Sequence, residues 1–389
     1  MQTAPSPPLL ALGALLHQRL ASIPCLHQAW CCALLNHPGH GNLGDHLIWA
    51  GQLHYLEHTR RLPVRYAAGP ADYAAAELRR AVADQTIVLS GGGQLGDMWP
   101  QLLAFIERVV RGHPGNPLVI FPQSLHFSDE DQRRRASATL QAHPDLTLVL
   151  RDEPSFQLAQ RHFSGCRLIL APDMAFALPA GLLLPHRPLP PVPHRRPWLA
   201  LRRLDRERAS TSRWEQALAP WRRRVECTDW LPLQRGWIWG DRRLPLSRTV
   251  ATGVREVLQR RLLMPRAALA RHQWQQDLPA PWRELVRSSS LHRLSLGMVH
   301  EACRQLAGRE LVISDRLHAV VLASLLGVPA LALDNGTGKV HAFLNTWSSG
   351  LPLARAITVE ALPQHLAEAA AGRAVPAPAP QTTADAPPP

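Results

Sequence analysis

Lysine is almost missing from this 389-residue chain: Lys339 is the single lysine, and arginine supplies nearly all of the basic charge. A net charge of +13 points to an anionic partner such as nucleic acid, a membrane surface or a phosphorylated small molecule. A GC-rich coding sequence also produces such an arginine-, alanine- and proline-rich composition, so charge alone does not choose among these partners. The arginines between Arg195 and Arg287 are scattered among tryptophan and proline. They form no recognisable nucleic-acid module, so we expect no nucleic-acid partner.

The sequence also lacks a long apolar run and a recognisable cysteine pattern. Its longest apolar stretch, residues 319–333, is shorter than the roughly 18 to 20 residues that cross a bilayer. The apolar segment at 9–16 has no preceding basic residue and no small-residue cleavage site, so we expect no secretory signal. The six cysteines form no CxxC pair and no zinc-like array. We therefore expect reduced thiols, no metal, no cofactor and a cytoplasmic protein.

Short apolar runs alternate with helical patterns along the chain, which predicts an α/β protein with parallel, doubly wound sheets. A first helical stretch is expected at 9–35. Strands are expected at 86–90, 118–122, 146–151, 167–171, 198–201, 311–314 and 329–333. Helices are expected at 47–58, 102–111, 154–162 and 317–326.

A proline-rich stretch divides the chain into two predicted domains. Proline lacks an amide donor and fixes φ, so residues 184–197 suit a linker better than a helix or a central strand. The predicted domains are 1–183 and 198–370, and the Ala/Pro-rich tail 371–389 is expected to be disordered.

Two glycine-rich segments are candidate ligand sites in the first domain. In residues 37–49, Asn42, Gly44 and Asp45 lead into a predicted helix, whose N-terminal amides can hold a phosphate or a sugar oxygen. Taken alone, Asp45 fits a simple helix-capping role better than a ligand-binding one. Gly91, Gly92 and Gly93 follow a predicted strand, where glycines allow either close approach of a ligand or tight packing against a neighbouring segment.

Three further motifs place polar residues at the ends of predicted strands, so they are candidates to line one cleft. They are FPQS at 121–124, with Gln123 and Ser124; LRDEPS at 150–155, with Arg151; and APDMAF at 171–176. Taken singly, each also fits a cap or a turn.

Residues 311–339 form the most specific stretch. Arg316 and His318 begin a helix after one predicted strand, and Asp334 follows the next strand. A guanidinium with helix-terminal amides suits a carboxylate or a phosphate, and a histidine supplies a proton near neutral pH. GTGK at 336–339 is not a P-loop, but in this arginine-rich chain Lys339 is a candidate for a required compact positive charge.

Taken in order, GNLGD, SGGGQLGD, FPQS, RDEPS, APDMAF, SDRLHA and DNGTGK resemble the ordered motifs of the polysaccharide pyruvyltransferases. The resemblance covers residues 42 to about 347. It implies two Rossmann-like domains facing a central cleft, as in the GT-B class of glycosyltransferases. It also implies transfer of a pyruvyl (carboxyethylidene) group from phosphoenolpyruvate to two sugar hydroxyls, as a ketal.

The resemblance assigns Arg316 and His318 to the phosphoenolpyruvate site, with Arg202 as the matching arginine at the start of the second domain. The glycine loops then face the acceptor sugar, and Asp45 orients a hydroxyl. The implied acceptor belongs to an exopolysaccharide or its lipid-linked repeat unit, with peripheral contact at the inner membrane. Gln94-Leu95 depart from the family pattern, and little of residues 202–290 matches it.

Two other functions are compatible with these observations. One is a GT-B glycosyltransferase that uses a nucleotide sugar. The other is a non-catalytic basic protein that docks on anionic lipid or nucleic acid through its arginine-rich middle, with strongly salt-dependent binding.

Overall fold

The structure is a computed structural model that describes residues 6–39, 41–179, 183, 197–205, 207–208, 212–230, 282–285 and 289–373. The predicted linker 184–197, except Pro197, lies outside the described residues, as does the predicted tail beyond residue 373. Most of the arginine- and tryptophan-rich region 202–290 lies outside them as well. The proposed domain limits therefore stay predictions.

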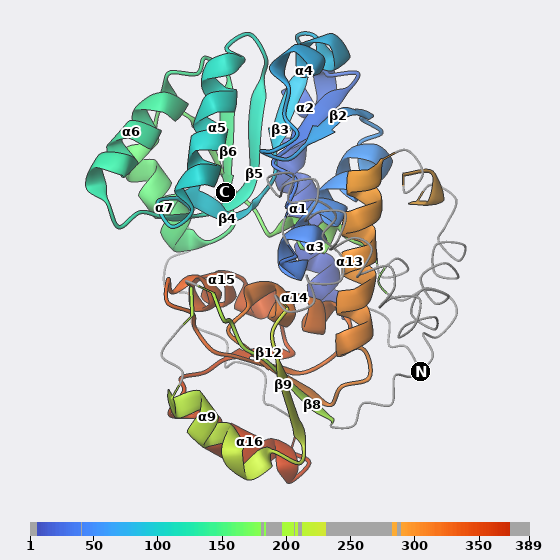
Figure 1. Cartoon of the computed structure of the whole chain (residues 1–389), viewed down its shortest axis with the longest axis vertical. Helices are drawn as coiled ribbons and strands as arrows, with labels where there is room; N and C mark the ends of the chain where they lie inside the picture. Colours follow the sequence, from blue (N-terminus) through green and yellow to red (C-terminus); the bar gives the residue numbers. More distant parts are fainter. Residues whose placement is uncertain are drawn as a thin grey trace, which may run out of the picture.

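The first half of the chain forms a seven-stranded parallel sheet with the order β2-β1-β3-β5-β6-β7 and with β4 paired to β5 (Figure 1). Its strands are β1 (Cys32–Leu35), β2 (Val64–Ala68), β3 (Thr86–Leu89), β4 (Gly92–Gly96), β5 (Leu118–His126), β6 (Leu146–Leu150) and β7 (Arg167–Leu170). The four strands predicted in this half are confirmed as β3, β5, β6 and β7. Strands β1, β3 and β6 are buried throughout, as expected where helices cover both faces of a parallel sheet.

The helices of this half are α3 (Leu43–Leu53), α4 (Ala75–Val82), α5 (Pro100–Gly112), α6 (Glu130–Gln141) and α7 (Glu153–His162). Helices α5 and α7 confirm the predictions at 102–111 and 154–162. Helix α3 begins four residues before the predicted start at 47, because Asn42 caps it with its side-chain oxygen. It continues into the π-helical segment η1 (His54–Thr59).

The prediction of one helical stretch at 9–35 is wrong. The segment divides into α1 (Pro7–Ala21), α2 (Cys25–Gln28) and strand β1. Pro24 has no amide hydrogen to continue α1 and instead stands at the start of α2. The four residues of β1 are all fully buried, which suits a central strand rather than a one-sided helix.

The second half forms a five-stranded parallel sheet with the order β12-β11-β10-β8-β9. Its strands are β8 (Trp198–Leu201), β9 (Val225–Thr228), β10 (Leu311–Ser314), β11 (Ala330–Ala332) and β12 (Ala354–Ala356). The three strands predicted here are confirmed as β8, β10 and β11. In each sheet the strand that comes first along the chain, β1 or β8, lies between the strands that come second and third. The strand order therefore reverses at the pairs β1/β3 and β8/β10. Ligands in open α/β sheets bind at the carboxyl ends of such strand pairs.

The second sheet carries α9 (Ser212–Leu218), α13 (Ser290–Leu306), α14 (Leu317–Leu325), α15 (Lys339–Trp347) and α16 (Leu362–Ala370). Helix α14 confirms the helix predicted at 317–326. Short 3-10 turns lie at η2 (Met174–Ala177), η3 (Ala219–Trp221) and η5 (Ser348–Gly350). Helix α13 runs along α3 and so joins the two halves (Figure 1).

Buried packing continues from one half into the other. One apolar cluster contains Leu16 and Trp49 of the first half together with Leu322 of the second. Phe176 of η2 stacks on Phe343 of α15, with ring centroids 6.3 Å apart. This shared core fixes the two sheets relative to each other around the pocket described next.

Candidate functional site

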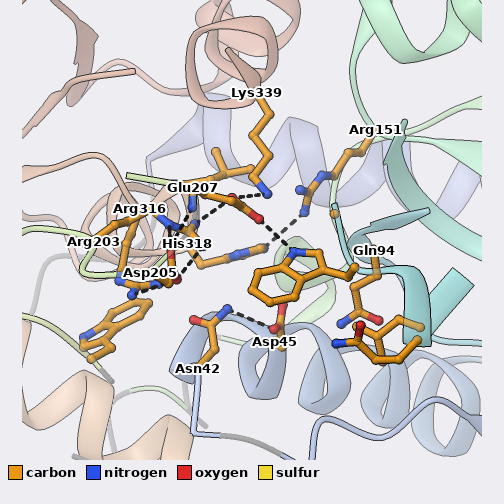
Figure 2. A pocket seen from close by; sticks show the side chains of 16 residues that line it. Asn42, Asp45, Gln94, Arg151, Arg203, Asp205, Glu207, Arg316, His318 and Lys339 are labelled. Carbon is orange, nitrogen blue, oxygen red and sulfur yellow. Dashed lines mark hydrogen bonds and ion pairs between the residues drawn. The ribbon is translucent and has the colours of Figure 1, made fainter. Parts of the chain in front are cut away.

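A pocket of about 340 Å³ lies where the carboxyl ends of the two sheets meet. The first half contributes Asn42, Asp45, Gly93, Gln94, Trp99, Gln101, Leu102 and Arg151 to its lining. The second half contributes Arg203, Asp205, Glu207, Trp230, Arg316, Leu317, His318 and Lys339. Figure 2 shows these side chains pointing toward one another from both sides. The structure therefore brings together six residues singled out in the sequence, and their roles stay predictions: Asn42, Asp45, Arg151, Arg316, His318 and Lys339.

The first glycine segment supplies the start of α3. The Asn42 side chain accepts a hydrogen bond from the Gly44 N–H at 3.4 Å and donates one to the Asp45 carboxylate at 2.9 Å. Asn42 is thus the helix cap, and Asp45 in the first turn turns its carboxylate toward the pocket (Figure 2). The residue that caps this helix is Asn42, so a simple capping role for Asp45 is not what the structure shows.

Gly44 touches the predicted catalytic histidine. A β-carbon at Gly44 would lie 2.7 Å from the His318 β-carbon and 2.8 Å from its Nδ1. Real β-carbons do not approach other heavy atoms this closely, so only glycine fits at position 44 without moving the imidazole. The glycine turn of the first half is therefore a close packing surface for a residue of the second.

The three successive glycines play different parts. A β-carbon at Gly91 would lie 2.7 Å from the Pro122 carbonyl, so Gly91 allows tight packing against β5. Gly92 begins β4 with φ of +133°, a conformation that favours glycine. Gly93 reaches the pocket, where an added β-carbon would lie 2.8 Å from Lys339 Nζ. Tight packing therefore accounts for a glycine at position 91. Gly93 lies in the pocket lining, where a ligand can approach its backbone.

Gln123 and Ser124 lie on β5 beside the pocket rather than in its lining. Gln123 donates to the Ser90 carbonyl at 2.8 Å and accepts from the Gln94 N–H at 3.2 Å, which ties β4 to its neighbours. Ser124 donates to Asp152 at 2.5 Å and accepts from Arg151 Nε at 2.9 Å. Ser124 also lines an adjoining cavity of about 200 Å³ that shares Gly93, Glu207 and Lys339 with the main pocket.

Arg151, Asp173 and His318 form a buried polar group between the halves. Asp173 accepts from Arg151 at 2.8 Å, and the same oxygen lies 3.3 Å from His318 Nε2. Its other oxygen accepts from the Ala175 N–H at 2.9 Å. Burial alone would raise the pKa of Asp173, but His318, Arg151 and the Ala175 amide together lower it. Asp173 is thus an ionised carboxylate that lies between the Arg151 guanidinium and the His318 imidazole.

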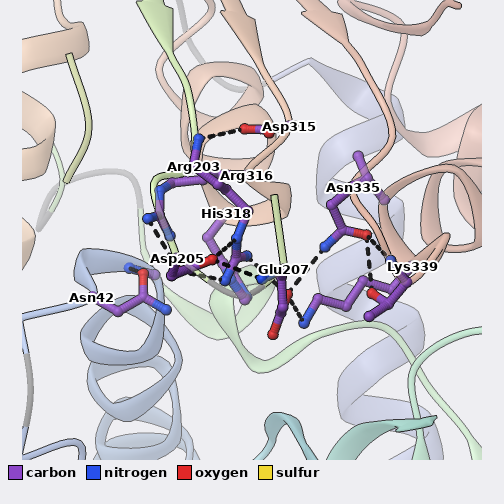
Figure 3. Close-up of polar contacts among 12 residues, drawn as sticks. Asn42, Arg203, Asp205, Glu207, Asp315, Arg316, His318, Asn335 and Lys339 are labelled. Atoms are coloured by element: carbon purple, nitrogen blue, oxygen red, sulfur yellow. Dashed lines mark hydrogen bonds and ion pairs between the residues drawn. The ribbon is translucent and has the colours of Figure 1, made fainter. Parts of the chain in front are cut away.

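Arg316 stands at the start of α14 and is almost completely buried. It donates to both oxygens of Asp229, through Nε and through Nη2 at 2.9 Å. Its Nη2 also lies 3.4 Å from Asp205, and Figure 3 shows these two side chains beside each other. Asp229 is itself held by the backbone amides of Leu204 at 3.0 Å and Trp230 at 2.6 Å. This network fixes the guanidinium next to His318, two residues further along α14.

The arginine after β8 that reaches the pocket is Arg203. The Arg202 side chain pairs with Glu215 at 2.6 Å and does not line the pocket. Arg203 is buried and holds Asp205 in a bidentate pair, with both distances at 2.8 Å. Its backbone N–H donates to Asp315. Because successive residues of an extended segment point to opposite sides, one of two adjacent arginines turns inward, and composition cannot say which.

Lys339 begins α15 directly after Gly338, whose φ is +74°. Its ammonium contacts Glu207 at 2.5 Å (Figure 3). Burial lowers the pKa of Lys339, and Glu207 acts in the opposite direction. Asp334 takes no place in the pocket lining: it accepts from the backbone N–H groups of Asn335, Val340 and His341 and so caps α15.

The acidic residues of the site were not among the residues predicted from the sequence. Asp205, Glu207 and Asp229 lie in or near the arginine-rich region that matched nothing, and Asp173 lies within the APDMAF motif without having been singled out. A usable signal was present for two of them: the RLDRE segment at 203–207 alternates basic and acidic residues directly after a strand. Such alternation is typical of ion pairs formed between neighbouring positions.

Within the described residues, no group of three or more histidine, cysteine, aspartate or glutamate side chains is placed to hold a metal ion. Among the helices of the same residues, none has both the length and the apolar character that crossing a membrane requires.

The chain is similar in sequence to known proteins. Residues 42–230 and 273–337 match the family described as "Polysaccharide pyruvyl transferase". The chain is 29% identical over 339 residues to "Putative pyruvyl transferase EpsO" of Bacillus subtilis, covering 85% of this chain and 91% of that protein. It is 27% identical over 332 residues to "Pyruvyl transferase 1" of Schizosaccharomyces pombe, covering 82% and 70% respectively.

A crystal structure of a functionally uncharacterised protein from Klebsiella pneumoniae has a similar fold. Its TM-score is 0.53 with 16% sequence identity, and the match covers 89% of this chain and 98% of that one. At this identity the similarity concerns the fold alone.

Proposed function

Because the chain belongs to the polysaccharide pyruvyl transferase family, we propose that it transfers pyruvate from phosphoenolpyruvate to two hydroxyls of one sugar, forming a ketal. The acceptor sugar belongs to an exopolysaccharide or to its lipid-linked repeat unit. The proposal includes a cytoplasmic reaction near the inner membrane surface, where a lipid-linked acceptor is within reach. No metal or cofactor takes part in the proposed chemistry.

The observation that carries this proposal is the convergence of cations around one histidine. Arg151, Arg203, Arg316 and Lys339 line the same pocket as His318. Phosphoenolpyruvate is small and carries a carboxylate and a phosphate, both of which guanidinium groups bind in bidentate fashion. A pocket of about 340 Å³ has room for this donor together with part of a sugar.

In the proposed reaction His318 protonates the methylene carbon of the donor, which becomes a methyl group. The neighbouring carbon gains oxocarbenium character, and one sugar hydroxyl attacks it. The bond to phosphate then breaks, and a second hydroxyl closes the ketal. Two hydroxyl protons leave the sugar in total: one replaces the proton given to carbon, and the other departs with the phosphate.

The contacts of His318 suit this task. The ionised Asp173 carboxylate lies 3.3 Å from the Nε2 of His318, and Arg151 Nη1 lies 3.5 Å from the same nitrogen, so both groups help to fix the orientation of the ring. Gly44 packs against the ring and limits its movement, and a fixed position is worth much of the rate when proton donor and carbon must align. Proton transfer by a placed acid contributes about 10²- to 10⁴-fold.

The wall from the first half suits the sugar. Asn42, Asp45 and the backbone at Gly93 offer neutral or acidic partners for hydroxyls, and Trp99 with Leu102 offers apolar surface for a sugar ring. We further propose that the two sheets belong to two Rossmann-like domains facing this pocket in the GT-B manner. The support is that both sheets reverse their strand order at the pairs whose carboxyl ends meet here.

The test is a transfer assay. The protein is incubated with phosphoenolpyruvate and a panel of p-nitrophenyl hexosides and lipid-linked glycans. The proposal expects released phosphate and an equal amount of acceptor carrying a carboxyethylidene group by mass spectrometry. Thermal protection by phosphoenolpyruvate but not by a nucleoside diphosphate is also expected. Protection by the nucleotide alone, with no ketal, would favour the glycosyltransferase instead.

A further inference from the structure

Glu207 occupies the centre of the cationic side of the pocket. Its Oε2 contacts Lys339 at 2.5 Å, Arg203 at 3.0 Å and Asn335 at 3.1 Å. Its Oε1 accepts from the indole N–H of Trp99 at 3.1 Å. Four donors from both halves of the molecule thus converge on one carboxylate that is only 3% exposed. The mechanism given above assigns this carboxylate no task.

Glu207 differs from the other acids of the site in how it is held. Asp173, Asp205 and Asp229 each accept at least one backbone N–H in addition to their arginine. Every hydrogen-bond or ion-pair partner given above for the Glu207 carboxylate is a side chain. Side chains can turn to a different ligand without any change in the backbone, so Glu207 is the acid of this group that an incoming anion can most readily replace.

The donors around Glu207 are also what the phosphate of the donor substrate requires. Lys339 and Arg203 offer two positive charges, and Asn335 and Trp99 offer neutral N–H groups. In the free enzyme, burial raises the pKa of Glu207 while Lys339 and Arg203 lower it, and the net result is a lowered pKa and a weak base. A phosphate that binds these two cations offsets their effect, so burial then dominates and the carboxylate becomes a stronger base.

We propose that Glu207 yields Lys339 and Arg203 to the donor phosphate, and that it then carries the proton of one acceptor hydroxyl to the departing phosphate. This step rests on the proposed function. The hydroxyl oxygen bonds to the ketal carbon as its proton moves to the Glu207 carboxylate. The carbon–oxygen bond to phosphate breaks, the bonding electrons leave with the phosphate oxygen, and Glu207 returns the proton to it.

The arrangement makes the base depend on the donor. Without phosphoenolpyruvate the carboxylate is held by Lys339 and Arg203, and with the donor bound it lies between phosphate and acceptor. The charged groups that contact it are Lys339 of α15 and Arg203 of its own loop, and Asp205, Arg151, Arg316 and the titratable His318 line the same pocket. These groups set the pH range over which Glu207 works.

The first experiment compares wild type with Glu207→Gln, which keeps the shape of the side chain but accepts no proton. We expect kcat to fall about 10²- to 10⁴-fold. Affinity for phosphoenolpyruvate, measured by calorimetry, stays equal or rises, because a competing carboxylate is gone. Glu310→Gln is the matched control: Glu310 is exposed, pairs with Arg224 at 3.3 Å and lies outside the pocket, so no change is expected.

A purely structural Glu207 predicts a different pattern, in which the variant binds the donor more weakly and melts earlier. The pH profile separates the two roles as well. Wild-type kcat falls on the acidic side as Glu207 becomes protonated, whereas the Gln variant lacks this limb. Retention of more than a tenth of wild-type kcat in Glu207→Gln would overturn the proposal.

A second variant, Glu207→Ala, is tested with added formate. We expect formate to restore part of the turnover by taking the place of the missing carboxylate, and no effect of formate on the folded variant would count against the proton-carrying role. If wild type itself releases no phosphate from phosphoenolpyruvate with any acceptor, the proposed function fails. If wild type is active and Glu207→Gln is equally active, only the role of Glu207 fails.

Discussion

The two walls of the pocket are built in different ways. The wall from the first half relies mainly on backbone geometry: a capped helix start at Asn42, a close approach at Gly44 and a run of three glycines that ends at Gly93. It adds the ion pair between Arg151 and Asp173. The wall from the second half relies on ion pairs, in which Arg203, Arg316 and Lys339 each hold a carboxylate.

This difference supports the proposal that the wall from the second half binds the donor and the wall from the first half binds the acceptor. Backbone positions cannot adjust to a charge, but they hold neutral hydroxyls in fixed places. A cation of an ion pair can exchange one anion for another at a moderate cost in free energy. This suits the proposed donor, which binds as an anion and is then divided into phosphate and the pyruvyl group of the product. The histidine lies at the contact of the two walls, against Gly44 on one side and near Asp173 on the other.

The largest effect is expected from removing the group at that contact. His318→Ala should lower kcat for ketal formation by about 10²- to 10⁴-fold, because no other acid is placed beside the donor carbon in this account. Arg151 and Asp173 still pair in the variant, so its melting temperature should stay near that of wild type. Phosphate release measures the first quantity and calorimetry the second. Near-normal turnover would remove His318 from the chemistry.

The next effect tests whether the glycine wall positions the histidine. Gly44→Ala adds a β-carbon 2.7 Å from that of His318, so the imidazole must move. A displacement of this kind costs on the order of 10²-fold in rate. Gly39→Ala is the matched control, because an added β-carbon there meets nothing within 4 Å. Equal activities of the two variants would show that the contact at Gly44 does not matter for catalysis.

A smaller effect should distinguish the two adjacent arginines of the charged wall. Arg203→Lys keeps the positive charge but loses bidentate hydrogen bonding to an anion, and we expect KM for phosphoenolpyruvate to rise about 10-fold. Arg202→Lys changes only an ion pair with Glu215 outside the pocket, and we expect less than about a twofold change. The reverse order would return Arg202 to the donor site.

The smallest effect concerns stability and pH. Burial raises the pKa of Asp315 to about 6, and the contacts with Arg203 and Arg316 offset only part of this rise. The pKa of Asp315 is higher in the folded protein than in the unfolded chain, so the protonated carboxyl stabilises the folded protein fully below about pH 4. This stabilisation is lost as the pH rises through about 6.

Asp315→Asn removes this pH dependence. The difference in melting temperature between variant and wild type should therefore grow in favour of the variant from pH 4 to pH 7, and reach a few degrees at most. A difference that is constant across this range would mean that Asp315 does not titrate there.

The regular parts of the molecule followed from the sequence. Strands such as β3 and β10 are short apolar runs ending in polar residues, and α5 and α14 have clear helical patterns. The helix expected at 9–35 was wrong because a buried strand and a buried helix share one apolar signature, and Pro24 carried the deciding information. Strand β4 was missed because glycines have low strand propensity, and its pairing with β5 depends on close backbone contact.

The residues of the pocket that lie within the sequence motifs could be singled out from the sequence. The residues of these motifs that line the pocket include Asn42, Asp45, Arg151, Arg316, His318 and Lys339, and their roles there stay predictions. The acids Asp173, Asp205, Glu207 and Asp229 were not found, because a carboxylate is recognised as part of a site only when its cation is placed next to it. Arg151 pairs with Asp173, Arg316 with Asp229 and Lys339 with Glu207, and in each pair the partners are far apart in the sequence although they belong to the same half of the molecule. Folding of each half brings them together, and the RLDRE segment at 203–207 is the exception that carries a local signal.

A crystal structure of the protein with phosphoenolpyruvate bound would show directly where the donor lies. We expect the donor between the two walls, with its phosphate against Lys339 and Arg203 and its methylene carbon beside the imidazole of His318. Donor bound elsewhere, or donor in the pocket with its methylene turned away from His318, would contradict this expectation.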